Sequence, residues 1–203
     1  MKEFWEERYG AEEFAYGVEP NKFFEKVLTE NSLKGAILLP AEGEGRNAVF
    51  AAKKGLNVTC FDMSTQGKLK AQKLAELNNV TINYLVGELS ELHFEKNSFD
   101  IIVLIYAHFP PNLKKAYHKK IASYLKKGGT LILEGFSKNQ LKINEENQQA
   151  FGPKNIDMLY TVEEIKNDFE NLEIQILKEE QIILNEGIHH TGKGSVIRFV
   201  GKK

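Results

Sequence analysis

The sequence predicts an α/β protein in which helices cover both faces of a mostly parallel sheet. Short apolar runs alternate with helix-like segments along most of the chain, as expected for parallel strands joined by crossover helices. The run Phe99 to Ile105 is apolar on both faces, which is typical of a central parallel strand. Two longer strand-like runs, Glu173 to Leu184 and Ser195 to Gly201, follow later and can close the sheet with an antiparallel last strand.

The expected elements can be placed in order along the chain. Seven strands are expected at residues 36–39, 57–61, 80–86, 99–105, 130–134, 173–184 and 195–201. Helices are expected at residues 21–30, 46–54, 64–77, 112–125 and from 161 onward. Ser64 is placed to cap the third helix, from which Leu69, Leu74 and Leu77 should face inward.

Three connections complete this assignment. The lysines and glycines at 126–129 should end the fourth helix in a turn. The segment 135–160 is expected to be an irregular insertion, and the loop 185–194 should join the last two strands.

Composition limits the class of protein. A chain of 203 residues, 42% hydrophobic and 27% charged, suggests one ordinary soluble domain with a substantial core. A net charge of −1 gives no electrostatic reason to expect a nucleic acid or an anionic membrane as partner. The longest apolar run, Ile101 to Ala107, is too short to span a bilayer. No signal peptide begins at Met1, so we expect a cytoplasmic protein, and the single cysteine, Cys60, should be a buried thiol.

The most informative segment is the turn after the first strand. Gly43 and Gly45 follow this strand and precede a helix, and the next strand leads to Asp62. Glycines let the backbone approach a ligand, and the helix points its first amides at the ligand's negative end. An acid at the tip of the second strand can accept hydrogen bonds from both ribose hydroxyls. This order predicts a nucleotide-like ligand at the edge of a Rossmann-like sheet.

The pattern resembles the class I S-adenosylmethionine-dependent methyltransferases, and most closely the small single-domain group that includes the tellurite-resistance and thiopurine methyltransferases. In that group an acid ends the first strand and Gly-x-Gly-x-Gly follows; here Leu39 stands at the acid's position and Ala41 at the first glycine's. The resemblance covers residues 34–135 best. It implies a seven-stranded sheet, one methyltransferase domain over residues 1–203, and S-adenosylmethionine as cofactor.

The resemblance also assigns cofactor contacts. Glu42 would replace the missing acid and contact the cofactor's amino group. Glu88 would accept a hydrogen bond from the adenine amine, and the Leu89 N–H would face the ring, although Glu88 could instead cap a helix turn. The cofactor contacts expected from the loops are Ala41, Glu42, Gly43, Gly45, Asp62, Met63, Glu88, Leu89 and Tyr106.

The amino-terminal region, residues 1–31, is too aromatic to be a solvated tail. In related small-molecule methyltransferases this region folds over the cofactor and substrate, so we expect a lid. Arg8 could pair with the cofactor carboxylate through its guanidinium fork, and Tyr16 could pack over the sulfonium methyl. The alternative is that the aromatic residues of this region fill the edge of the core.

Three histidines are candidates for catalysis. His108 follows the fourth strand, where reactive groups in this fold face the methyl; it could instead merely satisfy the loop backbone. His189 and His190 could act as a general base or orienting group. Adjacent residues of an extended chain point to opposite faces, and no His-x-x-x-His spacing occurs, so no metal site is expected. We expect Tyr16, His108 and His189 or His190 to converge near the transferable methyl.

The sequence therefore predicts S-adenosylmethionine-dependent methyl transfer to a small-molecule acceptor by in-line displacement. The protein is expected to be a monomer or homodimer without a nucleic-acid or membrane partner. One alternative is a non-catalytic S-adenosylmethionine-binding or sensing protein. A second is a nicotinamide-dependent oxidoreductase, for which a third glycine would be expected where the chain has Arg46, Asn47 and Ala48.

Overall fold

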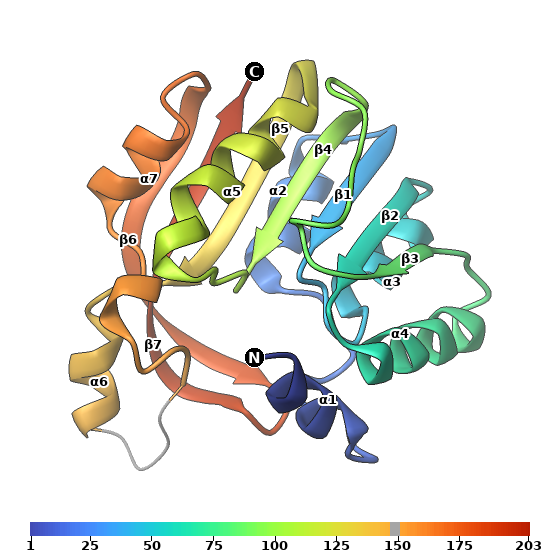
Figure 1. Ribbon diagram of the computed structural model, residues 1–203, viewed down its shortest axis with the longest axis horizontal. Coiled ribbons are helices and arrows are strands. Elements are labelled where there is room, and N and C mark those ends of the chain that lie inside the picture. Colours follow the sequence, from blue (N-terminus) through green and yellow to red (C-terminus); the bar gives the residue numbers. More distant parts are fainter. Residues whose placement is uncertain (147–150) are drawn as a thin grey trace.

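Seven strands form one sheet in the order β3-β2-β1-β4-β5-β7-β6 (Figure 1). The computed structural model describes residues 1–146 and 151–203. The strands are β1 (Ala36–Pro40), β2 (Asn57–Asp62), β3 (Asn83–Val86), β4 (Phe99–Ile105), β5 (Leu125–Phe136), β6 (Glu173–Glu186) and β7 (His190–Lys202). The first five are mutually parallel, and β7 runs antiparallel to both β5 and β6. The predicted sheet, with six strands in one direction and the last reversed, is confirmed.

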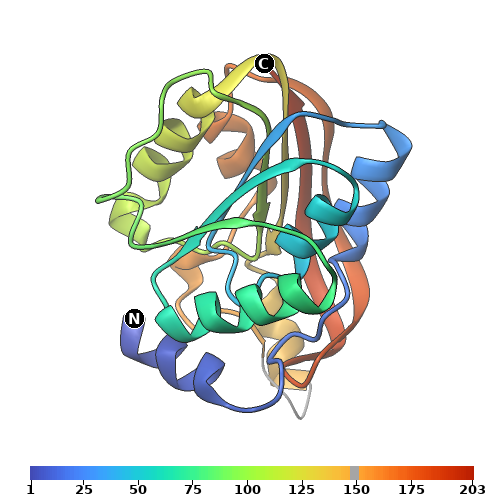
Figure 2. The ribbon, with the colours of Figure 1, turned by 90° about the vertical axis from the view of Figure 1, so that its right-hand side faces the viewer.

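Helices cover both faces of the sheet. They are α1 (Lys2–Gly10), α2 (Lys22–Glu30), α3 (Arg46–Lys53), α4 (Thr65–Leu77), α5 (Pro111–Tyr124), α6 (Gln140–Glu146) and α7 (Val162–Asp168), with a short 3₁₀ helix, η1 (Ile156–Met158). In Figure 1, α5 and α7 lie in front of the sheet and α2 and α3 behind it. Figure 2 shows α1 beside α4, below the sheet.

Alternation along the central strands divides the core between these two layers. In β4, Ile102 and Leu104 pack in the cluster that includes Ile121 of α5. The intervening Ile101 and Val103 pack in the cluster that includes Phe24 of α2. Side chains of one strand point alternately to opposite faces, so a strand apolar at every position is buried between two helical layers.

The helix caps follow the sequence closely. The Ser64 hydroxyl accepts a hydrogen bond from the Gly67 N–H at the start of α4, and Thr161 caps α7 in the same way. Leu74 is buried in α4 as expected, but Leu69 and Leu77 are 55% and 69% exposed, so their inward orientation was wrong. The inner face of α4 is made instead by small residues, Gly67 and Ala71 among them, because α4 lies close to the glycine turn.

Several element boundaries differ from expectation. β3 begins at Asn83, because Val80 and Ile82 pack against α3 and α4 before the strand starts. β5 begins directly after α5 and includes residues 126–129, which were expected to be a turn. The expected irregular segment 135–160 contains the end of β5, α6 and η1; its residues 147–150 lie outside the described residues.

The largest difference lies in the last hairpin. β6 extends to Glu186 and β7 begins at His190, with these two residues paired, so most of the expected loop 185–194 is strand. Gly187, at φ +62°, makes the tight connection. Within residues 1–146 and 151–203, no helix has both the length and the apolar character needed to cross a bilayer.

Candidate active site

The turn between β1 and α3 uses left-handed backbone at three positions. Ala41, Gly43 and Gly45 have φ values of +54°, +61° and +85°. A Cβ on Gly43 would lie 2.6 Å from the Tyr9 hydroxyl, and one on Gly45 would lie 2.5 Å from the Cβ of Ala71. Both glycines are therefore required by conformation and by close packing. Ala41 takes the same strained conformation with a methyl side chain.

Asp62 lies beside this turn at the carboxyl end of β2, as predicted. Its Oδ2 accepts a hydrogen bond from the Gly43 N–H at 3.1 Å, and its Oδ1 accepts one from the Ser64 N–H at 3.0 Å. Burial raises the pKa of Asp62 to about 6, against the effect of these amide donors. The carboxylate is thus held in place at the turn, where a ligand with hydroxyl donors could reach it.

Glu42 is directed toward α3. Its Oε1 accepts a hydrogen bond from the Ala48 N–H at 2.7 Å, in the first turn of a helix whose N-cap residue, Gly45, has no side chain. Burial raises the pKa of Glu42 to about 7. In this conformation Glu42 substitutes for a helix cap, and its contact with a cofactor amino group stays a prediction.

Helix α1 covers the glycine turn. The Glu6 carboxylate accepts hydrogen bonds from the Ser64 hydroxyl at 2.7 Å and from the N–H groups of Thr65 and Gln66, both at 2.9 Å. Donation from these two amides and the hydroxyl lowers the pKa of Glu6 to about 2. An acid at a helix N-terminus is also favoured by the helix dipole. α1 is thereby fixed to α4, with Tyr9 over Gly43.

Residues 11–20, here called the strap, connect α1 to α2 and are held by the glycine turn. Glu44 accepts a hydrogen bond from the Ala15 N–H at 2.8 Å and forms an ion pair with Lys70 at 2.8 Å. Arg46 donates to the carbonyl oxygens of Tyr16 and Glu19. The motif does not indicate these roles of Glu44 and Arg46, because their partners are backbone groups of a distant segment.

Tyr16 and His190 belong to one aromatic cluster. The ring centroids of Tyr16 and Tyr106 lie 4.4 Å and 4.6 Å from that of His190, and Phe136 lies 5.3 Å from it. His189 is farther from Tyr16, at 6.1 Å. The strap, the loop after β4 and the last hairpin thus meet, as predicted for Tyr16 and the carboxyl-terminal histidines.

A carboxylate orients His190. Glu186 Oε2 lies 3.2 Å from His190 Nδ1, and Arg46 Nη2 lies 2.9 Å from the same oxygen. Burial raises the pKa of Glu186, but the His190 hydrogen bond and the Arg46 charge outweigh it and lower this pKa to about 2. Burial also lowers the pKa of His190, against the pull of Glu186. At neutral pH this favours a neutral imidazole whose Nδ1–H donates a hydrogen bond to the ionised Glu186 carboxylate.

Backbone groups contact both ring nitrogens of His108. Its Nδ1 lies 3.0 Å from the carbonyl oxygen of Met158, and its Nε2 accepts a hydrogen bond from the Phe136 N–H at 3.1 Å. The ring stacks on Tyr160 at 4.7 Å, and burial lowers its pKa to about 4. Backbone groups thus occupy both ring nitrogens in this conformation, and the catalytic role expected of His108 stays a prediction. The histidine satisfies the loop backbone.

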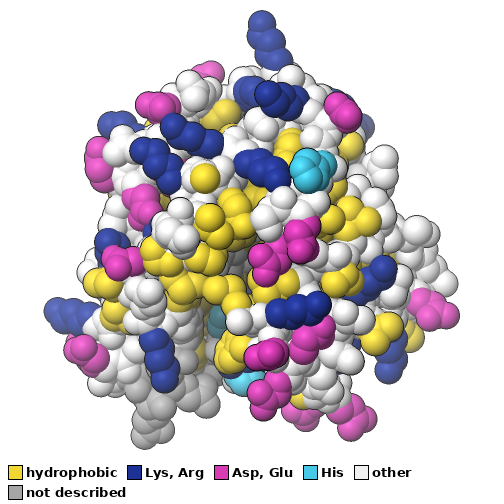
Figure 3. Space-filling view, in the orientation of Figure 1, with side chains coloured by type: hydrophobic (Ala, Val, Ile, Leu, Met, Phe, Trp, Pro, Cys, Tyr) yellow, Lys and Arg dark blue, Asp and Glu magenta, His cyan; other side chains and the backbone are white. Residues whose placement is uncertain are grey.

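Four predicted cofactor contacts remain: Arg8, Met63, Glu88 and Leu89. Arg8 donates to the Tyr16 hydroxyl at 3.0 Å. Met63, half-buried, follows Asp62 directly. Glu88 is exposed and its carbonyl oxygen accepts from the next turn, whereas the side chain of Leu89 is buried. Figure 3 shows hydrophobic side chains gathered around a hollow on the face of the molecule that Figure 1 presents.

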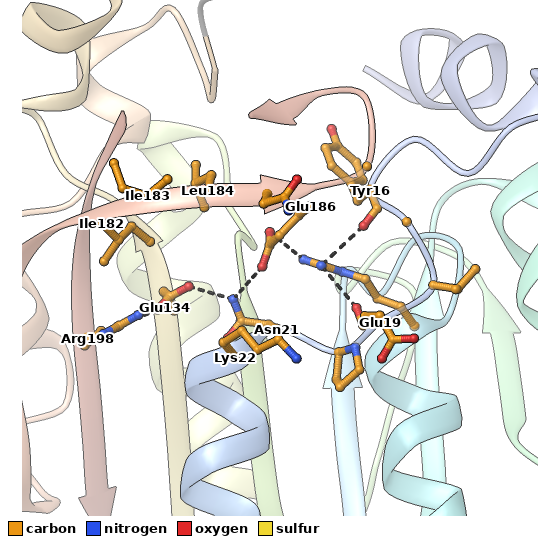
Figure 4. A pocket seen from close by; sticks show the side chains of 16 residues that line it. Tyr16, Glu19, Asn21, Lys22, Glu134, Ile182, Ile183, Leu184, Glu186 and Arg198 are labelled. Atoms are coloured by element: carbon orange, nitrogen blue, oxygen red, sulfur yellow. Dashed lines mark hydrogen bonds and ion pairs between the residues drawn. The ribbon is translucent and has the colours of Figure 1, made fainter. Parts of the chain in front are cut away.

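A pocket of about 280 Å³ lies between the strap and the last hairpin. Figure 4 shows Glu134, Asn21 and Glu186 joined in sequence among the residues that line it, and Arg46 continues this network through its ion pair with Glu186. Asn21 Nδ2 donates to Glu134 Oε1 at 2.6 Å and to Glu186 Oε1 at 3.2 Å. No sequence pattern indicates this network, because its members lie far apart along the chain.

Comparison with known proteins identifies the part of the chain that forms this site. Residues 37–129 match the family model of the methyltransferase domain. Over this segment, which includes the glycine turn and Asp62, the chain is similar to methyltransferases. The resemblance seen in the sequence is thereby confirmed, and the matched residues run from β1 into β5.

One relative of the chain is itself named as a methyltransferase. The chain is 27% identical over 161 residues to a tRNA (uracil(54)-C(5))-methyltransferase of Pyrococcus furiosus, an alignment that covers 72% of this chain and 37% of that protein. The chain therefore spans little more than a third of this relative's length.

Solved structures share the fold of the methyltransferase domain. A S-adenosylmethionine-dependent methyltransferase from Methanosarcina mazei aligns with a TM-score of 0.70 at 20% identity, over 91% of this chain and 98% of that one. TehB from Haemophilus influenzae aligns with a TM-score of 0.72 at 14% identity, over 100% of this chain and 66% of that one. At these identities the likeness establishes the fold.

Proposed function

We propose that this methyltransferase domain binds S-adenosylmethionine at the carboxyl ends of β1 and β2 and methylates a small-molecule acceptor beside His190. The observation that carries the proposal is the buried Asp62 carboxylate against the Gly43–Gly45 turn, within the segment that matches the methyltransferase family. This arrangement suits a ligand with a ribose and a charged tail.

The residues of the turn fit that cofactor. The backbone at Gly43 and Gly45 is left-handed and carries no side chain, and Asp62 is an acceptor for hydroxyl donors. Arg8, already near the strap, could pair with the cofactor carboxylate. Tyr9 lies against Gly43, so α1 would cover the bound molecule. Bound there, the cofactor supplies a methyl group activated by a sulfonium.

His190 is the residue we assign as general base. Its Nδ1 is directed at Glu186, and its Nε2 makes no hydrogen bond with any residue the structure describes. Nε2 can therefore take the proton of an acceptor O–H, N–H or S–H group as the acceptor atom bonds to the methyl carbon and the carbon–sulfur bond breaks. Arg46 keeps Glu186 ionised, so Glu186 fixes the tautomer. His189 is a weaker candidate because its ring lies outside this contact.

A small acceptor is favoured over RNA by charge and enclosure. The net charge is −1, whereas RNA-binding surfaces are strongly basic. Aromatic rings from Tyr16, Tyr106 and Phe136 surround His190, which suits a compact, partly apolar acceptor. The similarity to a tRNA methyltransferase makes tRNA the second candidate acceptor.

Two measurements test the proposal. Calorimetric titration should show binding of S-adenosylmethionine and S-adenosylhomocysteine but not of NAD, and Asp62→Ala should weaken that binding. Incubation with methyl-tritiated S-adenosylmethionine and a fractionated cell extract should then label the low-molecular-weight fraction. Absence of binding would overturn the cofactor assignment, and label in the tRNA fraction alone would overturn the small-molecule acceptor.

A further inference from the structure

Tyr106, directly after β4, has a backbone conformation that tyrosine seldom adopts. Its φ of +52° lies in the left-handed region, where a bulky side chain persists only if its surroundings hold it. Glu134 of β5 accepts two hydrogen bonds from Tyr106. The Glu134 carbonyl oxygen accepts from the Tyr106 N–H at 2.7 Å, and Glu134 Oε1 accepts from the Tyr106 hydroxyl at 3.0 Å. Backbone and ring of Tyr106 are thus fixed by one residue.

The Glu134 carboxylate is also connected to His190, through Asn21 and Glu186. Glu134 Oε1 accepts from Asn21 Nδ2, and this nitrogen also donates to Glu186 Oε1. Glu186 in turn orients His190. A single amide nitrogen therefore connects the carboxylate behind Tyr106 with the carboxylate behind His190 (Figure 4).

The charge of Glu134 is balanced on the side away from Tyr106. Arg198 Nε donates to Glu134 Oε2 at 2.6 Å, and Arg198 Nη1 donates to Glu180 at 2.6 Å. Glu134 is 1% exposed, so both of its oxygens are engaged within the protein. Neither oxygen is left to contact an acceptor, which distinguishes Glu134 from a catalytic residue.

We propose that Glu134 is a positioning residue for methyl transfer, which fixes Tyr106 directly and His190 through Asn21 and Glu186. The inference rests on the proposed function, since it takes His190 as the base. Tyr106 packs edge-on against the His190 ring at 4.6 Å. Displacement of the Tyr106 ring or of the Glu186 carboxylate would therefore turn His190 Nε2 away from the methyl acceptor.

Glu134→Gln provides the main test. Glutamine offers one acceptor oxygen where glutamate offers two, so either Arg198 or the Tyr106–Asn21 pair loses its partner. The readout is the position of the ring proton of His190, measured by nitrogen-15 NMR on histidine-labelled protein, which contains only five histidines. We expect the proton on Nδ1 in the parent and a measurable population on Nε2 in the variant. Glu180→Gln, which removes the other carboxylate bound to Arg198, is the matched control and should leave His190 unchanged.

Asn21→Asp tests the connecting step separately. Aspartate caps α2 as well as asparagine does, but it cannot donate to Glu134 or Glu186. We expect the same change at His190 as in Glu134→Gln, with the His108 signal unaltered. If His190 keeps its parent signal in both variants while the other histidines are unchanged, the inference is wrong.

Two further measurements separate positioning from a merely structural role. S-adenosylhomocysteine affinity should be retained in Glu134→Gln, while kcat with the labelled acceptor fraction falls by about tenfold or more because the base is misplaced. Joint loss of S-adenosylhomocysteine binding and of the native His108 signal would show that Glu134 only supports the fold. A parent protein that fails to bind S-adenosylhomocysteine would instead refute the proposed function, whatever the NMR result.

Discussion

Individual residues of the site are tuned mainly by burial. Asp62 and Glu42 have raised pKa values, about 6 and about 7, because desolvation opposes their ionisation. Glu186 has a lowered pKa despite its burial, since His190 and Arg46 face it. The site therefore contains carboxyl groups that titrate near neutrality at the glycine turn and one that stays ionised beside the histidine.

The Asp62 carboxyl should make cofactor binding depend on pH. Its ionised form accepts hydrogen bonds from a ribose, so we expect the affinity for S-adenosylhomocysteine to fall as the pH is lowered through about 6. Asp62→Asn should bind more weakly, by roughly 1.5–3 kcal/mol, and should lose this transition. Calorimetry from pH 5 to pH 8 measures both effects, about tenfold in affinity per 1.4 kcal/mol. A variant whose affinity still falls through the same transition would contradict the assignment.

The adjacent histidines offer a matched pair of variants. His190→Gln should lower kcat by roughly 10²- to 10⁴-fold, the usual contribution of a general base, without weakening S-adenosylhomocysteine binding. His189→Gln should have little effect, because His189 is only partly buried and has no carboxylate partner among the described residues. Steady-state kinetics on the labelled acceptor fraction compare the two. Equal losses from both substitutions would count against the assignment of His190.

At the scale of elements, α1 and α4 form one unit over the glycine turn. Glu6 joins them through the first turn of α4, and Trp5 stacks on Tyr9 at 5.3 Å. Trp5 is the single tryptophan of the chain, so its fluorescence reports whether α1 is docked.

Glu6→Ala should release α1 from α4. We expect Trp5 emission to shift to longer wavelength as its ring enters water, with far-ultraviolet circular dichroism nearly unchanged. Glu7→Ala, one position along on the exposed side, is the control and should leave the emission unaltered. The pKa of Glu6 is lowered to about 2, so its stabilising effect exists above pH 4.5 and is lost as the pH falls toward 2. Identical spectra for both variants would show that Glu6 does not hold the helix.

The close approach of α4 to the glycine turn makes Gly45 sensitive to substitution. Gly45→Ala adds a Cβ 2.5 Å from the Cβ of Ala71 and 2.8 Å from its Cα, in left-handed backbone that costs roughly 1–2 kcal/mol for alanine. We expect at least that loss of unfolding free energy, with partial recovery in Gly45→Ala/Ala71→Gly. Ala41→Gly, at φ +54°, should be neutral or stabilising. Urea denaturation measures all three, and an undiminished midpoint for Gly45→Ala would contradict the packing.

The sequence identified most strands and helices because their apolar patterns are regular. The sequence predicts the α1 region only as part of a lid, because charged residues interrupt its apolar pattern and its docking depends on Glu6 bonding to a distant helix. The ends of β6 and β7 were missed because polar residues interrupt the apolar pattern around residues 185–194. With that hairpin extended, Glu186 stands opposite His190, a pairing that no local pattern reveals.

At the scale of the whole molecule, the site is assembled from both ends of the chain. Sequence patterns located Asp62, Gly43 and Gly45, which lie in one βαβ unit. They did not locate Glu134 or Asn21, since these residues act through contacts between β5, α2 and β6. The sequence therefore predicts site residues that belong to a local motif, but not those whose role depends on contacts between distant segments.

The position of β7 predicts unequal effects of shortening the chain. A chain that stops at Gly187 lacks β7, which pairs with both β5 and β6, and should fail to fold. A chain that starts at residue 12 lacks α1 but keeps every strand, so it should stay folded and lose affinity for S-adenosylhomocysteine. Circular dichroism and size-exclusion chromatography distinguish these results. A folded chain without β7 would show that β5 alone can end the sheet.

The place of β7 between β5 and β6 also affects how the protein is made. β6 leaves the ribosome before β7, yet it has no partner in the sheet until β7 has been synthesised. During that interval β5 has one free edge and all fourteen residues of β6 are unpaired. Free strand edges readily pair with other chains. Fast completion of the last hairpin, or a chaperone that covers β6 meanwhile, would therefore protect the newly made chain from aggregation.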